Sequence, residues 1–439
     1  MMNRRSFLRM GAGAPLAARL ACARSAGTPS SHLRLASFGA NGMAYYTLDG
    51  IARHADVTLT AVAEVDATRL DKVKEKFPAV RVYDDWRRML DKEHRNIDIA
   101  CIGTPDHMHA PMAMSAMERG LHVYVQKPLT HDIHEARQLA AMARKKKLVT
   151  QMGIQVHSSR EYRTAVAAIQ GGAIGKVKEV HSWSNKKWGD LEPMPDRSDP
   201  VPAGLNWNQW LGVAAARPFV GGEYYHPSNW RKRIDFGTST FGDMGCHIFD
   251  PVFGSLQLTA PLSVRSEGPA PSQHSWAIND IIHYVFPGTQ YTDGKTVNIT
   301  WYDGDERPPK DVLDLLGSVK APGQGSIFIG AKGVMLLPHV GLPLLLPLEQ
   351  FRNFEMPEEE AANHYFQFVD AVMGKGKTSA GFDYSGPLTE AVLLGPVATR
   401  FPQTTLEWNA AKMTFKNSAE ASALVRRPYR AGWHVKGLG

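Results

Sequence analysis

The feature that most constrains the fold of this chain is a regular alternation of short apolar segments with helical ones over residues 33–153. The apolar segments are expected to be strands, at residues 33–38, 57–65, 80–83, 98–103, 122–125 and 149–152. The segments between them are expected to be helices, ending near residues 54, 77, 92, 119 and 146. Strands that alternate with helices of 10–15 residues build a parallel sheet with helices on both faces. The pattern therefore predicts an α/β fold whose N-terminal domain, residues 33–153, is a doubly wound parallel sheet.

The pattern changes after residue 153. A helix is expected at residues 160–171, and strand-like runs follow at residues 177–184, 280–286, 296–301, 326–330 and 333–337. Their alternation with one polar face indicates an open, half-exposed and mainly antiparallel sheet. Helices are expected at residues 363–372 and 386–397, the second packing back on the first domain. Residues 154–439 are thus predicted to form an α+β domain, and its role in substrate binding and oligomerisation is what the family resemblance described below implies.

The first 26 residues have the pattern of a signal peptide. Arg4 and Arg5 start a positively charged segment that resembles a twin-arginine export motif, and a mildly apolar stretch with small residues follows. This predicts export to the periplasm, with an amphipathic N-terminal tail as the alternative. A lipoprotein anchor at Cys22 is disfavoured because Arg19 stands where an apolar residue is expected. An exported enzyme cannot draw on a cytosolic cofactor pool, so it should hold its cofactor tightly and regenerate it in place.

Composition excludes several classes of protein. The formal charge of +7 falls to +2 without the five arginines of the first 24 residues, which argues against nucleic-acid binding. Beyond this leader no apolar run approaches the roughly 20 residues of a membrane span. Cys101 and Cys246 lie in apolar surroundings and are expected to be buried thiols rather than a disulfide.

The turn after the first strand has the pattern of a nucleotide-binding loop. Residues 37–42 fit G-x-G-x-x-G with Ser37 in the first place, and Gly39 lets the backbone approach a pyrophosphate at the N-terminus of the next helix. Glu64 or Asp66, at the end of the second strand, can accept hydrogen bonds from the ribose hydroxyls, which favours NAD. Arg69 leaves NADP as the less favoured cofactor, and a tight turn with incidental acids is the structural alternative.

A lysine follows the strand at residues 122–125. Lys127 precedes Pro128 at the carboxyl edge of the sheet, where ligands of such sheets bind. The strand at residues 98–103 ends at the same edge, so that Thr104 can line the nicotinamide ribose. A solvated loop lysine is the alternative.

Several sequence phrases together resemble the Gfo/Idh/MocA family of oxidoreductases, and within it the secreted, twin-arginine branch. They are Gly103-Thr104-Pro105 with His107 and His109, residues 120–123 leading into Lys127-Pro128, and residues 242–250, 382–390 and 429–433. The resemblance covers residues 33–433 and implies a Rossmann domain, a nicotinamide cofactor, a sugar-type substrate and a possible homo-dimer or homo-tetramer. Two departures are Gln126, where the family has glutamate, and Ser37, where it has glycine.

Asp243 and His247 are spaced four residues apart and would share one face of a helix. Gly242 and Gly245 beside them are expected to leave room for a ligand, and a capping aspartate with a packed histidine is the alternative. The resemblance implies that Lys127, Asp243 and His247 are the catalytic set. We expect Lys127 to bind the hydroxyl and accept its proton, His247 to be its partner or the alternative base, and Asp243 to orient them.

The remaining site predictions follow from position. Gln155 and His157 come after the last Rossmann strand, and residues 225–231 form a loop of polar and aromatic residues that could stack on sugar rings, although a structural role is equally open. His107 and His109 lack a third ligand, so no metal is predicted. The predicted cofactor contacts are Ser37, Gly39, Ala40, Asn41, Gly42, Met43, Glu64, Asp66, Thr104, Pro105, His107, His109, Gln126, Lys127 and Gln155. The predicted substrate contacts are Lys127, His157, Tyr225, Asn229, Trp230, Arg231, Asp243 and His247.

The favoured function is an NAD(P)-dependent oxidoreductase that takes a hydride from a secondary hydroxyl of a sugar, glycoside or polyol. One alternative is an NAD-dependent glycoside hydrolase that oxidises C3, eliminates the aglycone and reduces the sugar again, with Tyr225 or His157 as the additional acid–base group. A second alternative is a non-catalytic sugar-binding protein.

Overall fold

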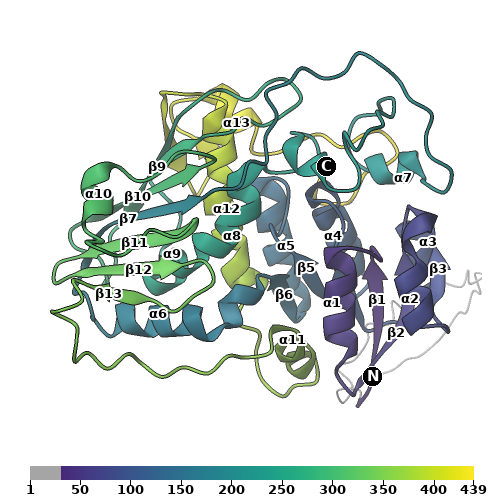
Figure 1. Cartoon of the computed structure of the whole chain (residues 1–439). Coiled ribbons are helices and arrows are strands. Elements are labelled where there is room, and N and C mark those ends of the chain that lie inside the picture. The colour runs from purple at the N-terminus through teal and green to yellow at the C-terminus, as the bar shows by residue number, and fades with distance from the viewer. Residues whose placement is uncertain (1–30) are drawn as a thin grey trace, which may run out of the picture.

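The computed structural model describes residues 31–439 and consists of two sheets with helices between them (Figure 1). The predicted signal peptide, its twin-arginine pair and Cys22 lie outside the described residues. Among the described residues no helix is both long and apolar enough to cross a membrane. Cys101 and Cys246 are both free and buried, which confirms the prediction of two buried thiols.

The first sheet is parallel throughout and has the order β3-β2-β1-β4-β5-β6. Its strands are β1 Leu33–Phe38, β2 Val57–Ala63, β3 Arg81–Tyr83, β4 Ile99–Ile102, β5 His122–Gln126 and β6 Thr150–Gly153. The helices that connect them are α1 Met43–Ala52, α2 Asp71–Lys76, α3 Trp86–Glu93, α4 His109–Glu118 and α5 Ile133–Lys146, with 3-10 turns η1 Ala67–Arg69 and η2 Asp106–Met108. This is the predicted doubly wound sheet, and its order reverses between β1 and β4 as in Rossmann folds.

The main difference between the predicted and the observed helices of this domain lies after β2. The helix expected to end near residue 77 is divided into η1 and α2, because the Asp66 side chain accepts a hydrogen bond from the Thr68 N–H and starts a separate short turn.

The second sheet has nine strands in the order β13-β12-β11-β7-β10-β9-β8-β14-β15. The strands are β7 Val177–Ser184, β8 Ser263–Glu267, β9 Ile281–Pro287, β10 Thr296–Asp303, β11 Gln324–Gly330, β12 Val334–Pro338, β13 Leu344–Leu346, β14 Thr405–Asn409 and β15 Thr414–Phe415. Only β7 and β10 pair in parallel, so the predicted, mainly antiparallel sheet is confirmed.

The helices and 3-10 turns in the second half of the chain are η3 Gln155–Ser158, α6 Arg160–Gln170, α7 Trp207–Leu211, η4 Asn229–Lys232, α8 Ser239–Ile248, α9 Asp250–Ser255, α10 Lys310–Asp314, α11 His364–Val372, α12 Phe382–Thr399 and α13 Ala419–Ala423. Of these helices, α8 and α12 pack on one face of this sheet, and Val312 of α10 packs on residues of the other face. Helix α8 packs on β7, β10 and β11, and α12 lies between α8 and α5 (Figure 1). The chain after residue 363 thus joins the two sheets, since α11 packs on α1 and α12 packs on α5.

A buried ion pair anchors α12 to α5. Both oxygens of Glu390 accept hydrogen bonds from Arg137, at 2.6 and 2.7 Å, and Oε1 also accepts one from the Trp408 indole at 3.0 Å. Glu390 is buried, and Arg137 is about one-third exposed. A second pair between the same helices, Arg144 with Asp383, is mostly exposed.

Replacing Glu390 by glutamine should destabilise the protein by about 1–3 kcal/mol, because Arg137 loses its charged partner in a buried position. The matched control is Arg144→Ala on the same pair of helices, which should cost less than about 1 kcal/mol because its partner is exposed. Urea unfolding followed by tryptophan fluorescence measures both. Equal losses for the two variants would contradict this assignment.

Candidate functional site

A cleft of about 600 Å³ lies at the carboxyl edge of the parallel sheet, a size typical of cofactor and substrate sites. One wall comes from the loops after β1, β2, β4 and β5, and includes Gly39, Glu64, Thr104 and Lys127. The other wall comes from the second half of the chain, with Asp243 and Met244 of α8, Lys186, Trp188 and the segment at residues 226–231. The cleft is therefore enclosed by both parts of the protein.

The loop between β1 and α1 fits a dinucleotide. Gly39 and Gly42 have φ of +100° and +56°, values that favour glycine, and a Cβ on Gly42 would meet nothing within 4 Å. Helix α1 begins at Met43 with no side-chain cap and no acidic residue in its first turn, so its N–H groups are available to a pyrophosphate. Ser37 is fully buried and donates a hydrogen bond to the Gly39 carbonyl at 2.7 Å, so it supports the loop from inside rather than lining the cleft.

The two acids after β2 have different positions. Glu64 lines the cleft, where it accepts hydrogen bonds from the Ala40 N–H at 2.9 Å and the Asp66 N–H at 3.0 Å, and burial raises the pKa of Glu64. Asp66 instead accepts from Arg69 at 3.0 Å and contacts His226 Nε2 at 2.9 Å. The structure thus leaves Glu64 as the acid able to meet a ribose, and Asp66 connects Arg69 to the second half of the chain.

Lys127 and Asp243 meet across the cleft. Lys127 Nζ donates to Asp243 Oδ1 at 2.8 Å and to the Asp243 carbonyl at 2.7 Å, and both side chains are 12% exposed. Arg231 Nε lies 3.3 Å from the same Oδ1 and its guanidinium is over the Trp230 ring. Burial would raise the pKa of Asp243, but the charges of Lys127 and Arg231 hold it well below its usual range. The cleft thus contains a fixed carboxylate between two cations.

His247 lies one turn beyond Asp243 on α8, as the spacing predicted. It lines a smaller cavity next to the cleft, and its ring centroid is 5.5 Å from that of His339. Burial first, and the nearby charge of Lys127 second, lower the pKa of His247 well below its usual range. His247 is therefore a neutral imidazole at neutral pH.

The glycines beside these residues have a different role from the one expected. A Cβ on Gly242 would come within 2.2 Å of Thr238 Oγ1, and one on Gly245 within 2.7 Å of the Phe241 ring. The prediction that they leave room for a ligand is wrong, because α8 uses both glycines to pack against its own protein neighbours.

Two predicted cofactor contacts, His109 and Gln126, line the cleft and also fix its wall in place. Both ring nitrogens of His109 contact carbonyl oxygens, of Pro128 at 2.7 Å and of Thr104 at 2.8 Å, and so fix the turn that follows Lys127. Gln126 lines the cleft and donates to Thr47 Oγ1 at 2.8 Å.

Other predicted residues lie away from the cleft. His107 is in the core, with Nε2 3.1 Å from the Trp210 carbonyl. Gln155 donates to the Tyr365 hydroxyl at 3.1 Å, and Asn229 donates to the Glu223 carbonyl at 3.0 Å. Tyr225 is 1% exposed, in an aromatic cluster with Trp207, Trp210 and Phe236. Of the aromatic loop at residues 225–231, Trp230 and Arg231 line the cleft, as do His226, Pro227 and Ser228.

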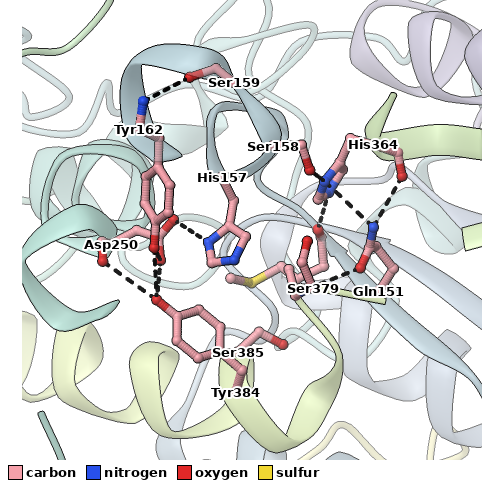
Figure 2. A network of polar contacts seen from close by, with 12 residues as sticks. Gln151, His157, Ser158, Ser159, Tyr162, Asp250, His364, Ser379, Tyr384 and Ser385 are labelled. Atoms are coloured by element: carbon pink, nitrogen blue, oxygen red, sulfur yellow. Dashed lines mark hydrogen bonds and ion pairs between the residues drawn. The ribbon is translucent and has the colours of Figure 1, made fainter. Parts of the chain in front are cut away.

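His157 belongs to a buried polar network (Figure 2). Its Nδ1 is 2.9 Å from Oδ2 of Asp250, which is fully buried, and its ring lies between those of Tyr162 and Tyr384. Both tyrosine hydroxyls donate to Asp250 Oδ1. The network joins η3, α6, α9 and α12, which indicates that His157 holds elements together next to the site rather than lining the cleft.

The cleft also contains residues that the sequence patterns did not indicate. Asp106, at the start of η2, is 3% exposed and accepts a hydrogen bond from Thr238 Oγ1 at 2.8 Å, and burial raises its pKa to about 7. Asp106 directly follows Thr104 and Pro105, which were predicted to line the cofactor site, and this position in the sequence could have indicated that Asp106 lines the cleft too. Lys186 and Trp188 come from a segment without a helix or strand pattern, and nothing in the sequence marked them.

Two family comparisons match most of the chain. The oxidoreductase family with an NAD-binding Rossmann fold matches residues 33–154, and the C-terminal alpha/beta domain of the same oxidoreductase family matches residues 176–435. This confirms the predicted NAD-type cofactor domain.

Curated relatives match only part of their length. The dTDP-3,4-didehydro-2,6-dideoxy-alpha-D-glucose 3-reductase of Streptomyces antibioticus is 30% identical over 172 residues, 38% of this chain and 52% of that protein. The alpha-N-acetylgalactosaminidase of Shewanella oneidensis is 30% identical over 130 residues, 28% of each protein. The chain thus spans about half the length, or less, of these relatives.

Solved structures show the same fold. The WlbA dehydrogenase from Bordetella pertussis in complex with NADH and UDP-GlcNAcA has a TM-score of 0.61 at 13% identity, over 86% of this chain and 99% of that chain. The aldose-aldose oxidoreductase from Caulobacter crescentus complexed with glycerol has a TM-score of 0.54 at 14% identity, over 86% and 100%. With both of its domains matched, this chain belongs to the Gfo/Idh/MocA family of oxidoreductases.

Proposed function

We propose that this protein is an NAD-dependent oxidoreductase that takes a hydride from a secondary hydroxyl of a sugar, glycoside or polyol. The observation that carries the proposal is the Lys127–Asp243 ion pair in the cleft that also contains the open N-terminus of α1. A dinucleotide bound at that terminus would extend along the edge of the sheet toward Lys127. The sugar dehydrogenases and reductases among the relatives support the substrate class.

The chain's own residues supply binding and proton transfer, and NAD supplies the hydride acceptor when it is bound. Asp243 fixes the Lys127 ammonium so that its remaining N–H can donate to a substrate hydroxyl. His247 does not line the cleft itself, but it lies one helical turn from Asp243, is influenced by the charge of Lys127 and is neutral, so it is the group that we propose accepts the hydroxyl proton. We therefore assign hydroxyl binding to Lys127 and the proton to His247, which is the alternative base of the sequence analysis. Trp188, which lines the cleft and is partly exposed, offers a ring on which a sugar can stack, whereas Trp230 is buried beneath the Arg231 guanidinium.

Enclosure of the cleft by both parts of the chain supports a tightly held cofactor that is recycled in place. We further propose that the protein is exported through the twin-arginine route and assembles as a homo-dimer or homo-tetramer.

A glycoside hydrolase is the second candidate, favoured by the alpha-N-acetylgalactosaminidase among the relatives. That route needs an additional acid–base group at the sugar. Neither Tyr225 nor His157 lines the cleft, whereas Asp106 does and has a pKa suited to gaining and losing a proton near neutral pH. Cleavage of nitrophenyl glycosides with exchange of the C2 hydrogen for solvent deuterium would identify this route, and Asp106→Asn should abolish it.

Cofactor retention is the first prediction from this function. Protein purified without added nucleotide and then denatured should release close to one NAD or NADH per chain, measured by chromatography of the supernatant. Absence of nucleotide, together with no activity after its addition, would favour the non-catalytic sugar-binding protein.

Replacing Lys127 by methionine should lower kcat by at least about a hundredfold, because the hydroxyl loses its charged donor in the transition state. Bound NAD should stay at the wild-type level, since Lys127 is not at the pyrophosphate loop. Lys187→Met is the matched control, because Lys187 pairs with Asp305 on the surface and should keep full activity. Steady-state rates on a sugar panel and the NAD content of each variant measure both. A Lys127 variant with normal kcat would contradict the catalytic assignment.

The buried Asp106 carboxyl should make the free energy of unfolding decrease as the pH rises. Its folded-state pKa of about 7 is above the ordinary 3.8, so between about pH 4 and pH 7 the unfolded chain ionises while the folded protein keeps the proton. The Asp106→Asn variant has no carboxyl to ionise, so it should not lose stability in this way. Its melting temperature should be close to that of the wild type at pH 4 and increasingly above it as the pH rises to 8. Asp84→Asn, on an exposed side chain of the same cleft, is the control and should show no such trend. Melting temperatures across this pH range provide the test, and a gap that does not grow with pH would refute it.

A further inference from the structure

A second, smaller cavity is lined by the same helix as the cleft. Helix α8 contributes Asp243 and Met244 to the cleft and His247 and Ile248 to this cavity, so His247 lines the cavity one helical turn from the Asp243 carboxylate. The cavity has a volume of about 20 Å³, which is enough for one water molecule but not for a sugar. Its other polar lining side chains are those of Ser159, Glu161, Tyr162, Ser326 and His339.

Two buried imidazole nitrogens lack a hydrogen-bond partner at this cavity. Nδ1 of His247 and Nδ1 of His339 are both buried, and neither has a partner among the described residues. Leaving a buried polar nitrogen unsatisfied costs about 1–3 kcal/mol, so two of them around one small cavity indicate that something polar satisfies both. The two rings are 5.5 Å apart, close enough for a single molecule to contact both.

Water fits this position better than a metal ion. The described residues contain no group of three histidine, cysteine, aspartate or glutamate side chains placed to hold a metal. A buried water typically makes about three hydrogen bonds, and the two imidazole nitrogens provide two of them. The Ser326 hydroxyl already contacts Ser182 Oγ at 2.8 Å and the Ile248 carbonyl at 3.3 Å, so it can supply only its remaining acceptor position as the third. Glu161 on α6 is partly exposed and borders the same cavity, so a proton that reaches it can pass to solvent.

We propose that this cavity binds one water molecule that carries the substrate proton from His247 to His339 and Glu161, and so forms the proton-release route of the oxidation. The inference rests on the proposed function, because it concerns the proton of that reaction. His339 acts through His247 and is therefore a positioning and relay residue rather than a catalytic one.

The proposed proton transfer conserves atoms and charge. The substrate loses a hydride from carbon to the nicotinamide, and its O–H bond breaks as the proton binds Nε2 of His247. The proton on the opposite nitrogen, Nδ1, passes to the water, which gives one of its own to His339 or Glu161. His247 returns to a neutral ring with the proton on the other nitrogen, and no further oxidant or reductant is needed. The charged and titratable groups that influence His247 are Lys127, Asp243, His339 and His364, and Lys127 and Lys186 influence His339.

The first experiment compares proton release with hydride transfer in a single turnover. Holoprotein is mixed with the sugar that it oxidises, the reduced nicotinamide is followed by absorbance, and the released proton is followed with a pH indicator in weak buffer. In the wild type the two signals should rise together. In the His339→Gln variant the rate of proton release should be at least about tenfold lower than the rate of hydride transfer, and added imidazole should restore the rate of proton release. His283→Gln, on a histidine that pairs with Glu267 on the second sheet, is the matched control and should behave as wild type.

Glu161→Gln is the second variant, because this side chain is partly exposed and its loss should not prevent folding. It should also delay the proton while leaving the hydride step unchanged. Proton release that keeps pace with hydride transfer in both variants would overturn the proposal.

A second measurement does not need activity. In the holoprotein with ¹⁵N-labelled histidine, NMR should show a long-lived water in contact with the rings of both His247 and His339, and His339→Gln should abolish it. If no sugar reduces the cofactor, the proposed function fails, and this measurement still decides whether the water site exists. Absence of such a water in the wild type would overturn the inference whatever the activity.

Discussion

The ion pair between Lys127 and Asp243 is the interaction on which the site depends. The two residues are 116 positions apart in sequence, and they come from the carboxyl end of β5 and from α8. The pair forms only when the parallel sheet and the second sheet are joined, since α8 packs on the second sheet while β5 lies inside the first. A buried ion pair contributes little net stability because desolvation opposes the Coulomb attraction. Its contribution here is to fix the position of an ammonium group in the cleft.

The joining of the two parts relies on further buried polar contacts of the same kind. Arg427 donates to Glu135 at 2.9 Å, and Glu390 accepts from Arg137, so that both contacts fix the face of α5. Asp250, fully buried at the start of α9, connects His157 with the hydroxyls of Tyr162 and Tyr384, which come from α6 and α12 (Figure 2). Together these contacts fix the orientation of α8 and α12 more specifically than apolar packing alone would, because each hydrogen bond depends on one geometry.

The sequence predicts the parts of the structure that follow from local periodicity. The six parallel strands and helices α5 and α6 could be located because strand and helix periods differ, and Lys127 could be placed because a strand end fixes the sheet edge. The direction of a side chain depends on distant residues and could not be predicted. Glu64 and Asp66 are two residues apart, yet only Glu64 reaches the cleft, because Asp66 meets Arg69 and His226. Tyr225 was placed at the substrate because of its loop, but Trp207, Trp210 and Phe236 bury it.

The position of Asp66 also bears on how the cofactor would be held. The segment at residues 226–231 forms the second wall of the cleft, and each of its ends is fastened by a charged contact, His226 with Asp66 and Arg231 with Asp243. Arg233, just beyond this segment, lies 2.8 Å from Asp190 and donates to Ser275 at 2.6 Å. We propose that a bound dinucleotide leaves only when this segment moves away from the first wall, which would break the His226–Asp66 and Arg231–Asp243 contacts together and so slow its release. Slow release of this kind is what an enzyme needs if it must oxidise and reduce one cofactor molecule within a single cycle.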